Sequence, residues 1–125
     1  MGDNKMFNDR PHKKLILWSE SMELVTELYR ITNLFPKEEE FGLKNQLRRA
    51  AVSIPSNIAE GLTRMTMPDK KRFLIIANGS LSEIDTQLDI ASRLKYISET
   101  DYDLVEEKII RVEKLLGGLI RKLNK

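Results

Sequence analysis

Histidine, cysteine and paired carboxylates do most of the chemistry in proteins, and this sequence offers few of them at useful spacings. It has one histidine, His12, and no cysteine. It lacks the Glu-x-x-His pairs with which helical bundles hold two metal ions, and it has neither a nucleophile elbow nor a glycine-rich phosphate loop. Glu60 and Glu83 are the carboxylates expected nearest the interior, where structural partners suit them better than acid–base catalysis. We therefore expect no catalytic residue, no metal and no cofactor, and hence a protein that is not an enzyme.

Basic side chains, in contrast, occur in groups. Lysine and arginine neutralise the phosphates of RNA or DNA, which gives salt-sensitive binding that depends little on base sequence. The candidate phosphate contacts are Lys44, Arg48, Lys70, Lys71, Arg72, Lys108 and Arg111. The alternative is a solvated helix surface on which these residues alternate with Glu and Asp. A net charge of +2 is too small to argue for nucleic acid by itself.

Composition limits where such a chain would act. Its 125 residues suffice for one domain with its own core. Residues 1–14 are polar and lack the apolar segment of a secretory signal, and no apolar run approaches the length of a membrane span. With no cysteine to form disulfides, the expected location is the cytoplasm, without membrane association.

The elements that must position the basic residues are helices. Apolar residues recur at three- and four-residue steps through residues 15–35, 39–64, 67–97 and about 100–123. Thr66-Met67-Pro68-Asp69 has the form of a helix start, and Thr100 with Asp103 repeats the capping pattern.

No stretch alternates apolar and polar residues as a strand would. Four helices with short connections predict an all-α fold, an antiparallel up-down-up-down four-helix bundle. We expect the bundle to span residues 15–125, after a flexible N-terminal arm at 1–14.

The second predicted helix contains a proline. Interior proline costs a helix about 3 kcal/mol, because it removes one hydrogen bond and its ring clashes with the preceding turn. Pro55 therefore predicts a kink that frees the carbonyl of Ala51, which neighbouring hydroxyl and amide groups could bond.

Pairing the second and third helices around a turn at Thr66 sets a register. Residues equally far from Thr66 then lie at the same level, which places Ser53 opposite Gly79 and Ser80, and Arg49 opposite Glu83. We expect a polar network with an Arg49–Glu83 ion pair, and such a pair contributes more to register than to stability. The members of the expected network are Arg49, Ser53, Asn57, Glu60, Ser80 and Glu83. The alternative is that these residues line a solvated face.

The fourth predicted helix has a wider apolar arc than one stripe needs. Leu104, Ile110 and Leu115 lie off the line from Val105 to Leu123. The arc is either a broad core face or a subunit interface.

Two runs carry a resemblance to a known family. The run QLRRAAVSIPSNIAEG, from Gln46 to Gly61, and the run FLIIANGSLSEIDTQL, from Phe73 to Leu88, closely resemble the bacterial four-helix-bundle family of 23S rRNA-intervening sequence proteins. The resemblance extends from about Leu15 to Leu123. It implies a left-handed antiparallel bundle that assembles into a ring-shaped homopentamer. A similar fold, with a positively charged surface that binds nucleic acid and a reverse transcriptase, occurs in the accessory protein of diversity-generating retroelements.

Two functions therefore stand side by side. The first is a non-enzymatic oligomer that binds RNA or DNA through basic residues, because assembly multiplies a modest charge per chain. The second is a protein-interaction scaffold or accessory subunit of a partner enzyme, without nucleic-acid binding of its own. Salt-sensitive binding to a polynucleotide would separate the first from the second.

Overall fold

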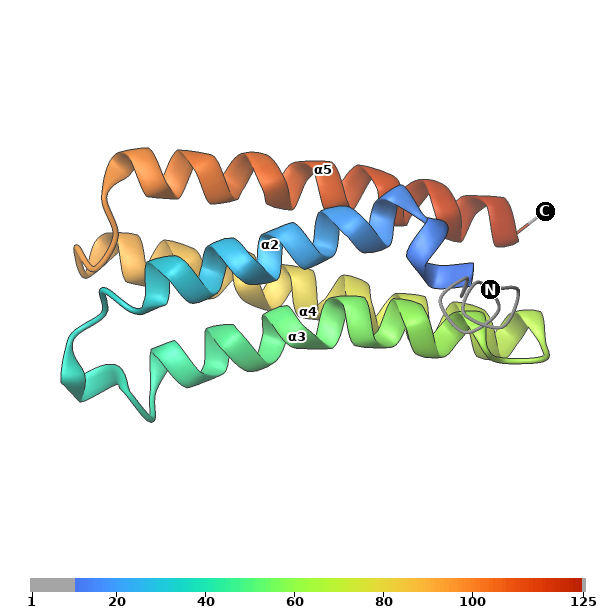
Figure 1. The fold of residues 1–125 in the computed structure, drawn as a ribbon, viewed down its shortest axis with the longest axis horizontal. Coiled ribbons are helices and arrows are strands. Elements are labelled where there is room, and N and C mark those ends of the chain that lie inside the picture. The colour runs from blue at the N-terminus through green and yellow to red at the C-terminus, as the bar shows by residue number, and fades with distance from the viewer. Residues whose placement is uncertain (1–10, 125) are drawn as a thin grey trace, which may run out of the picture.

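Four long helices make up the fold in the computed structural model, which describes residues 11–124 (Figure 1). The helices are α2 (Ile16–Thr32), α3 (Leu43–Leu62), α4 (Met67–Arg93) and α5 (Glu99–Leu123), with 3-10 helices η1 (Pro11–Lys14) and η2 (Lys37–Glu39). No strand occurs within this part of the chain. The predicted all-α bundle is thereby confirmed.

The helix ends follow local capping chemistry. The Thr66 hydroxyl accepts a hydrogen bond from the Asp69 N–H at 3.3 Å, as the sequence predicts for the start of α4. The predicted capping residue of α5, Thr100, is wrong. The cap is Ser98, whose hydroxyl accepts a hydrogen bond from the Asp101 N–H at 3.1 Å, and α5 begins before Thr100. α4 ends four residues before the predicted Ile97, and Lys95 follows it with a φ of 64°.

The core lies between the four helices and is built from their apolar stripes. Each fully buried Leu or Ile side chain contributes about 1.5–3 kcal/mol by leaving water. The fully buried large residues include Leu24, Leu28, Leu47, Ile54, Leu81, Ile84, Val105 and Leu116. Leu104 and Ile110 of the wide arc on α5 are 37% and 43% exposed, whereas Leu115 packs against the core. Six residues apart on a helix, Leu104 and Ile110 point in different directions and do not form one apolar face.

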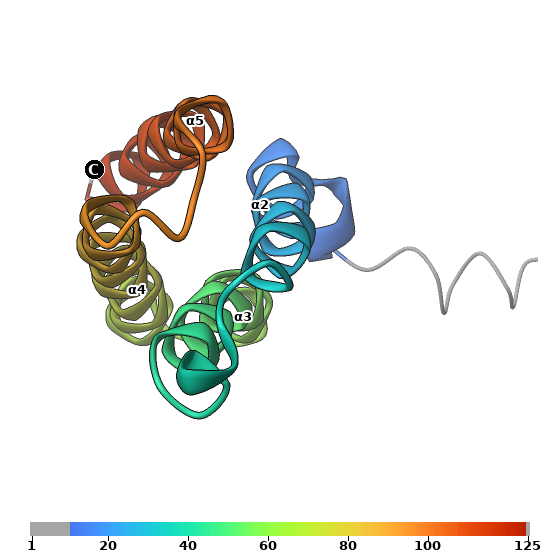
Figure 2. The same cartoon turned by 90° about the vertical axis from the view of Figure 1, so that its left-hand side faces the viewer.

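Viewed along the bundle, the helices follow an arc in chain order, and α5 returns towards α2 (Figure 2). Three ion pairs join α2 to α5: Arg30–Asp101 at 2.8 Å, Lys108–Glu23 at 3.6 Å and Arg111–Glu20. Residue numbers fall along α2 as they rise along α5, so the two helices run in opposite directions. Such exposed pairs contribute about 0.2–1 kcal/mol each, so they orient the helices more than they stabilise them.

Helices α3 and α4 are joined by polar contacts along their length. The Ser53 and Ser80 hydroxyls lie 2.8 Å apart, and Lys70 at the start of α4 donates to the carbonyl of Leu62 at 3.3 Å. These pairs show opposite directions and the register that symmetry about Thr66 predicts. The α3–α4 turn therefore lies at the same end of the bundle as the end of α5, as Figure 1 shows.

Pro55 lies inside α3 and is buried. The side-chain amide of Asn57 donates to the Ser53 carbonyl at 2.7 Å, so the local amide bonds that carbonyl and not the one expected from Ala51. The kink at Pro55 stays a prediction.

The expected N-terminal arm is described only in part. Residues 1–10 lie outside the described residues, and Pro11–Lys14 form η1. The His12 ring meets the Trp18 ring edge to face, with centroids 5.1 Å apart, so this part of the arm packs on the bundle. Within residues 11–124, no helix is both long and apolar enough to cross a bilayer.

Candidate nucleic-acid interface

Arg48 is held by α2 rather than left free for a phosphate. Its guanidinium donates to the Thr32 hydroxyl at 2.8 Å, to the Tyr29 carbonyl at 3.0 Å and to the Asn33 side chain at 3.0 Å. It also lies over the Tyr29 ring, 4.3 Å from the centroid. These bonds place a cation at the end of α2, where it meets the negative end of the helix dipole.

Three more of the predicted phosphate contacts pair with carboxylates. Lys44 lies 3.0 Å from Glu40, and Lys108 and Arg111 pair with residues of α2. The hydrogen bond from Arg111 lowers the pKa of Glu20, with a smaller contribution from Lys108. The Lys44–Glu40 pair is local to the start of α3, whereas the pairs of Lys108 and Arg111 orient α5 on α2. All three residues lie away from the α3–α4 turn.

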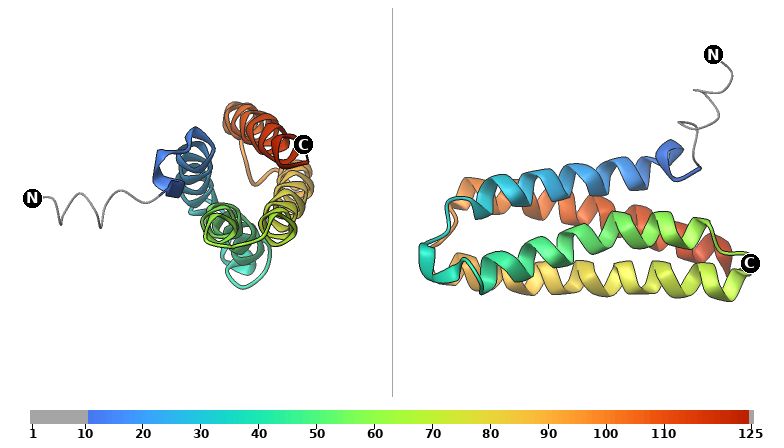
Figure 3. Two further views of the ribbon diagram at one scale, coloured as in Figure 1. Left: turned by 90° about the vertical axis from the view of Figure 1, so that its right-hand side faces the viewer. Right: turned by 60° about the horizontal axis from the view of Figure 1, so that its bottom comes forward.

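The other three predicted contacts, Lys70, Lys71 and Arg72, lie together at the start of α4. Lys71 donates to the Asn124 side chain at 2.7 Å, which places the start of α4 beside the end of α5. Figure 3 looks onto this end of the bundle in its left panel. We call it the basic end, and its members are Arg64, Lys70, Lys71, Arg72, Arg121 and Lys122.

An aromatic ring lies within the basic end. The Arg64 and Arg72 guanidinium carbons lie 4.5 Å and 4.6 Å from the centroid of the Phe73 ring. Both arginines also form ion pairs with acidic residues three or four positions before them in the sequence. Arg64 pairs with Glu60 at 2.9 Å, and Arg72 pairs with Asp69 at 3.8 Å. The ring holds the two guanidinium groups in place by cation–π attraction.

The opposite end of the bundle carries charges of both signs. It contains the α2–α3 and α4–α5 connections, and it faces the viewer in Figure 2. Its carboxylates include Glu38, Glu39, Glu40, Glu99, Asp101 and Asp103. Basic residues are interspersed with them at Arg30, Lys37, Lys44, Arg93 and Lys95, so the excess of positive charge lies at the basic end.

Arg64, Arg121 and Lys122 are absent from the residues singled out as phosphate contacts. The sequence held a signal for them: in an up-down-up-down bundle the turn between the second and third helices lies at the same end as the last turn of the fourth. Applying the topology to the charges would have brought Arg121 and Lys122 beside Lys71.

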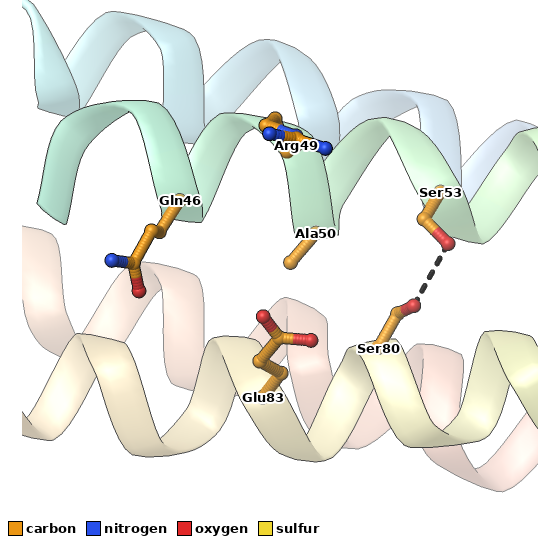
Figure 4. Close-up of a pocket in the computed structure, with 6 residues that line it drawn as sticks. All are labelled: Gln46, Arg49, Ala50, Ser53, Ser80 and Glu83. Carbon is orange, nitrogen blue, oxygen red and sulfur yellow. Dashed lines mark hydrogen bonds between the residues drawn. The ribbon is translucent and has the colours of Figure 1, made fainter. Parts of the chain in front are cut away.

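A second site is a polar cleft between α3 and α4. It has a volume of about 380 Å³ and is lined by Gln46, Arg49, Ala50, Ser53, Ser80 and Glu83. Figure 4 shows the carboxylate of Glu83 pointing towards α3 and the Ser53–Ser80 hydrogen bond beside it. Gln87 donates to Gln46 and to Glu83, each at 3.3 Å, and its own side-chain oxygen is buried without a partner among the described residues.

The expected network forms in part around this cleft. Ser53, Ser80 and Asn57 are joined by hydrogen bonds of 2.8 Å and 2.9 Å. The expected Arg49–Glu83 ion pair is not formed in the described part of the chain: both side chains are exposed, although they line the same cleft. Glu60 is exposed as well and pairs with Arg64 instead. Exposed charges keep their hydration, which explains why the register is set by neutral hydroxyls.

A third site, between α2 and α3, is an apolar cavity. Its volume is about 390 Å³, and its lining includes His12, Trp18, Met22, Val25, Val52 and Pro55. Over residues 11–124, no three His, Asp or Glu side chains converge in a way that could hold a metal ion.

Fold and charge together define a small all-α bundle protein with a polar cleft and a basic end. A family model places the chain more closely: it belongs to the 23S rRNA-intervening sequence proteins, whose model matches residues 13–118. A solved structure from Bacteroides thetaiotaomicron, a protein of unknown function from the S23 ribosomal protein family, is similar in fold. It has a TM-score of 0.78 and 24% identity, covering 84% of this chain and 98% of that chain. No curated protein matches the chain.

Proposed function

We propose that this protein is a non-enzymatic, cytoplasmic nucleic-acid-binding protein that binds the phosphates of RNA or DNA through its basic end. The observation that supports the proposal is the grouping of six basic side chains, from Arg64 to Arg72 and at Arg121 and Lys122, around one end of the bundle. Only Glu60 and Asp69 oppose them there through ion pairs in the described residues. Such a cluster attracts polyanions at moderate salt.

Helix stability does not account for the basic residues of α4. The N-terminal end of a helix dipole is positive, so Asp69 is the residue that favours the first turn. Lys70, Lys71 and Arg72 bring the disfavoured sign into the first two turns. Their position fits a partner that brings negative charge.

The uneven distribution of charge gives the binding a direction. The α2–α3 and α4–α5 connections carry mixed charges, whereas the α3–α4 turn lies among basic residues, so the bundle would meet a polynucleotide with the α3–α4 turn first. Arg64 and Arg72 flank Phe73, which offers planar groups for an unpaired base to stack upon.

We propose further that the protein is a homo-oligomer, with the ring of five that the family resemblance implies. A ring places several basic ends side by side and multiplies their attraction for phosphate. Light scattering on a size-exclusion column tests this, and the expected mass is close to five chains of 14.5 kDa.

Binding to a structured RNA and to a DNA duplex, measured by fluorescence anisotropy over a salt series, tests the interface. Engagement of six phosphates by one basic end predicts a slope of log K against log salt of about −4 to −5.5. Lys71→Gln with Arg72→Gln should reduce the slope by about 1 to 2 and weaken binding for every sequence alike. Lys108→Gln with Arg111→Gln is the matched control, which removes the same charge from the α2–α5 seam. Equal losses in the two double variants would contradict a site at the basic end.

The apolar cavity favours a second candidate function, a scaffold for a protein partner. Met22 and Val52, which line it, are 40% and 42% exposed. Exposed apolar side chains around a cavity fit an apolar segment of another polypeptide. An assembled protein that binds no polynucleotide at low salt would favour this candidate over the first.

A further inference from the structure

Helix α4 presents an exposed stripe that the fold of one chain leaves uncovered. Its members, spaced by three or four residues, are Ile76, Gly79, Glu83, Thr86 and Ile90, and all five are exposed. Ile76 and Ile90 at its ends are 42% and 43% exposed. An apolar–small–polar–apolar order along one helix face is typical of a face that contacts another helix.

Gly79 has no explanation within the chain. A glycine inside a helix destabilises it relative to alanine, so it usually marks a close contact. Gly61 on α3 has one, because a Cβ there would lie 3.1 Å from the Phe73 Cβ. A Cβ at Gly79 would meet nothing within 4 Å. The space above Gly79 is open to something outside the chain.

Helix α3 has a complementary stripe. Asn45, Arg49, Val52 and Ser56 are exposed and follow the same helical spacing. Val52 is 42% exposed, and it borders a hollow of about 560 Å³ together with Arg49 and Asn45. The Arg49 side chain makes no hydrogen bond or ion pair with another described residue.

The two stripes match level by level. The Ser53–Ser80 bond sets the register, so Arg49 lies at the level of Glu83 and Val52 at the level of Gly79 along the bundle. Rotation about an axis parallel to the bundle preserves these levels. It therefore brings Glu83 of one copy beside Arg49 of the next copy. It also brings the open space above Gly79 beside Val52 of that next copy.

We propose that the α4 stripe of one copy of this chain packs on the α3 stripe of the next copy, with an Arg49–Glu83 ion pair between copies and Val52 seated over Gly79. The inference rests on the proposed assembly and names the contact that would build it. It also accounts for two charged groups that border one cleft without pairing inside the chain.

Charge reversal tests the pair. Arg49→Glu and Glu83→Arg should each weaken association by about tenfold or more, because each places like charges across the contact. An equimolar mixture of the two variants should recover association between unlike copies, since the carboxylate introduced at position 49 in one variant then meets the guanidinium introduced at position 83 in the other. The recovered species are alternating complexes of two or more chains and not a closed ring of five, because two variants cannot alternate throughout a ring of odd number. Lys114→Glu and Glu107→Arg, which change exposed residues of α5 away from both stripes, should leave the mass unchanged.

Gly79→Gln independently tests whether the open space above Gly79 receives Val52 of the next copy. Nothing in the chain obstructs the new side chain and glutamine favours helix, so the thermal midpoint of the isolated chain should rise. The same side chain fills the space that Val52 of the next copy needs, so the assembled fraction should fall. A rise in midpoint with an undiminished assembled fraction would overturn the proposed contact.

The remaining outcomes also decide the question, with circular dichroism used to verify that each variant is folded. Single reversals that keep the wild-type mass would overturn this contact and leave the proposed assembly to another face. Single reversals that dissociate without recovery on mixing would overturn the intermolecular pair. A wild-type chain that stays monomeric at every concentration would overturn both the contact and the proposed assembly, while the test of the basic end would stand unaffected.

Discussion

The hydroxyl groups of Ser53 and Ser80 lie 2.8 Å apart and join the middle of α3 to the middle of α4. Ser80 is buried at 9% exposure, and Asn57 donates to the Ser53 hydroxyl at 2.9 Å. A one-turn slip of either helix would break this bond and leave a buried hydroxyl unpaired. The neutral pair therefore fixes the register that a charge pair was expected to fix.

Removing either hydroxyl should reveal their coupling. Ser53→Ala and Ser80→Ala should each lower the free energy of unfolding by about 0.5–1.5 kcal/mol. The double variant should cost less than the sum, because each single change already breaks the shared bond. Urea unfolding of the four proteins measures the cycle, and strictly additive losses would show that the hydroxyls act separately.

Arg48 should behave as a stabilising residue. Arg48→Lys keeps the charge but loses the planar fork that reaches Thr32, Tyr29 and Asn33, so the free energy of unfolding should fall by about 1–3 kcal/mol. Arg93→Lys is the control, since Arg93 is exposed and pairs with no other described residue. If Arg48→Lys were as stable as the control but bound RNA less tightly, the original assignment of Arg48 to phosphate would be right.

The contrast between Arg48 and Arg49 shows what helical periodicity alone cannot predict. The apolar periodicity placed both on one helix, and consecutive residues on a helix point about 100° apart. Which of them meets a neighbour depends on where α2 ends. The predicted helix ran to Phe35, whereas α2 ends at Thr32, and Arg48 donates to the Thr32 hydroxyl, the Tyr29 carbonyl and the Asn33 side chain at that end.

The fold was easier to predict than the interface for a physical reason. Burial of Leu and Ile at helical spacing is a property of each segment, so periodicity alone predicts four helices. The register of α3 on α4 followed from one turn at Thr66. A charge cluster, in contrast, joins segments far apart in sequence, as Lys71 and Asn124 show.

The stability of the folded chain is expected to depend on pH through Glu106. Burial raises its pKa above the ordinary 4.5, and the carboxylates of Asp85, Asp89 and Glu113 raise it further. One of its oxygens is buried without a hydrogen-bond partner among the described residues. Because the folded chain binds this proton more tightly than the unfolded chain, stability falls as the pH rises above 4.5.

Glu106→Gln should therefore raise the thermal midpoint at neutral pH and leave it almost unchanged below pH 4.5, where Glu106 is already protonated. Glu107→Gln, at an exposed neighbouring position, should change neither value. Scanning calorimetry at both pH values measures the difference. A lower midpoint for Glu106→Gln at neutral pH would mean that the ionised carboxylate is stabilising.

Tyr102 provides a spectroscopic test of the contact between α4 and α5. Its hydroxyl donates to Asp89 at 2.6 Å, and this bond, with burial, raises the pKa of Tyr102 to about 12. The folded chain holds the proton more tightly than the unfolded one, so the contribution is complete below pH 10 and is lost between pH 10 and about 12. Asp89→Asn should lower the pKa of Tyr102 back towards 10, measured by tyrosinate absorbance.

Glu39→Gln is the matched variant for a different tyrosine. It should lower the raised pKa of Tyr96, whose hydroxyl donates to Glu39 at 3.0 Å. An unchanged titration in Asp89→Asn would show that Asp89 is not what holds the Tyr102 proton.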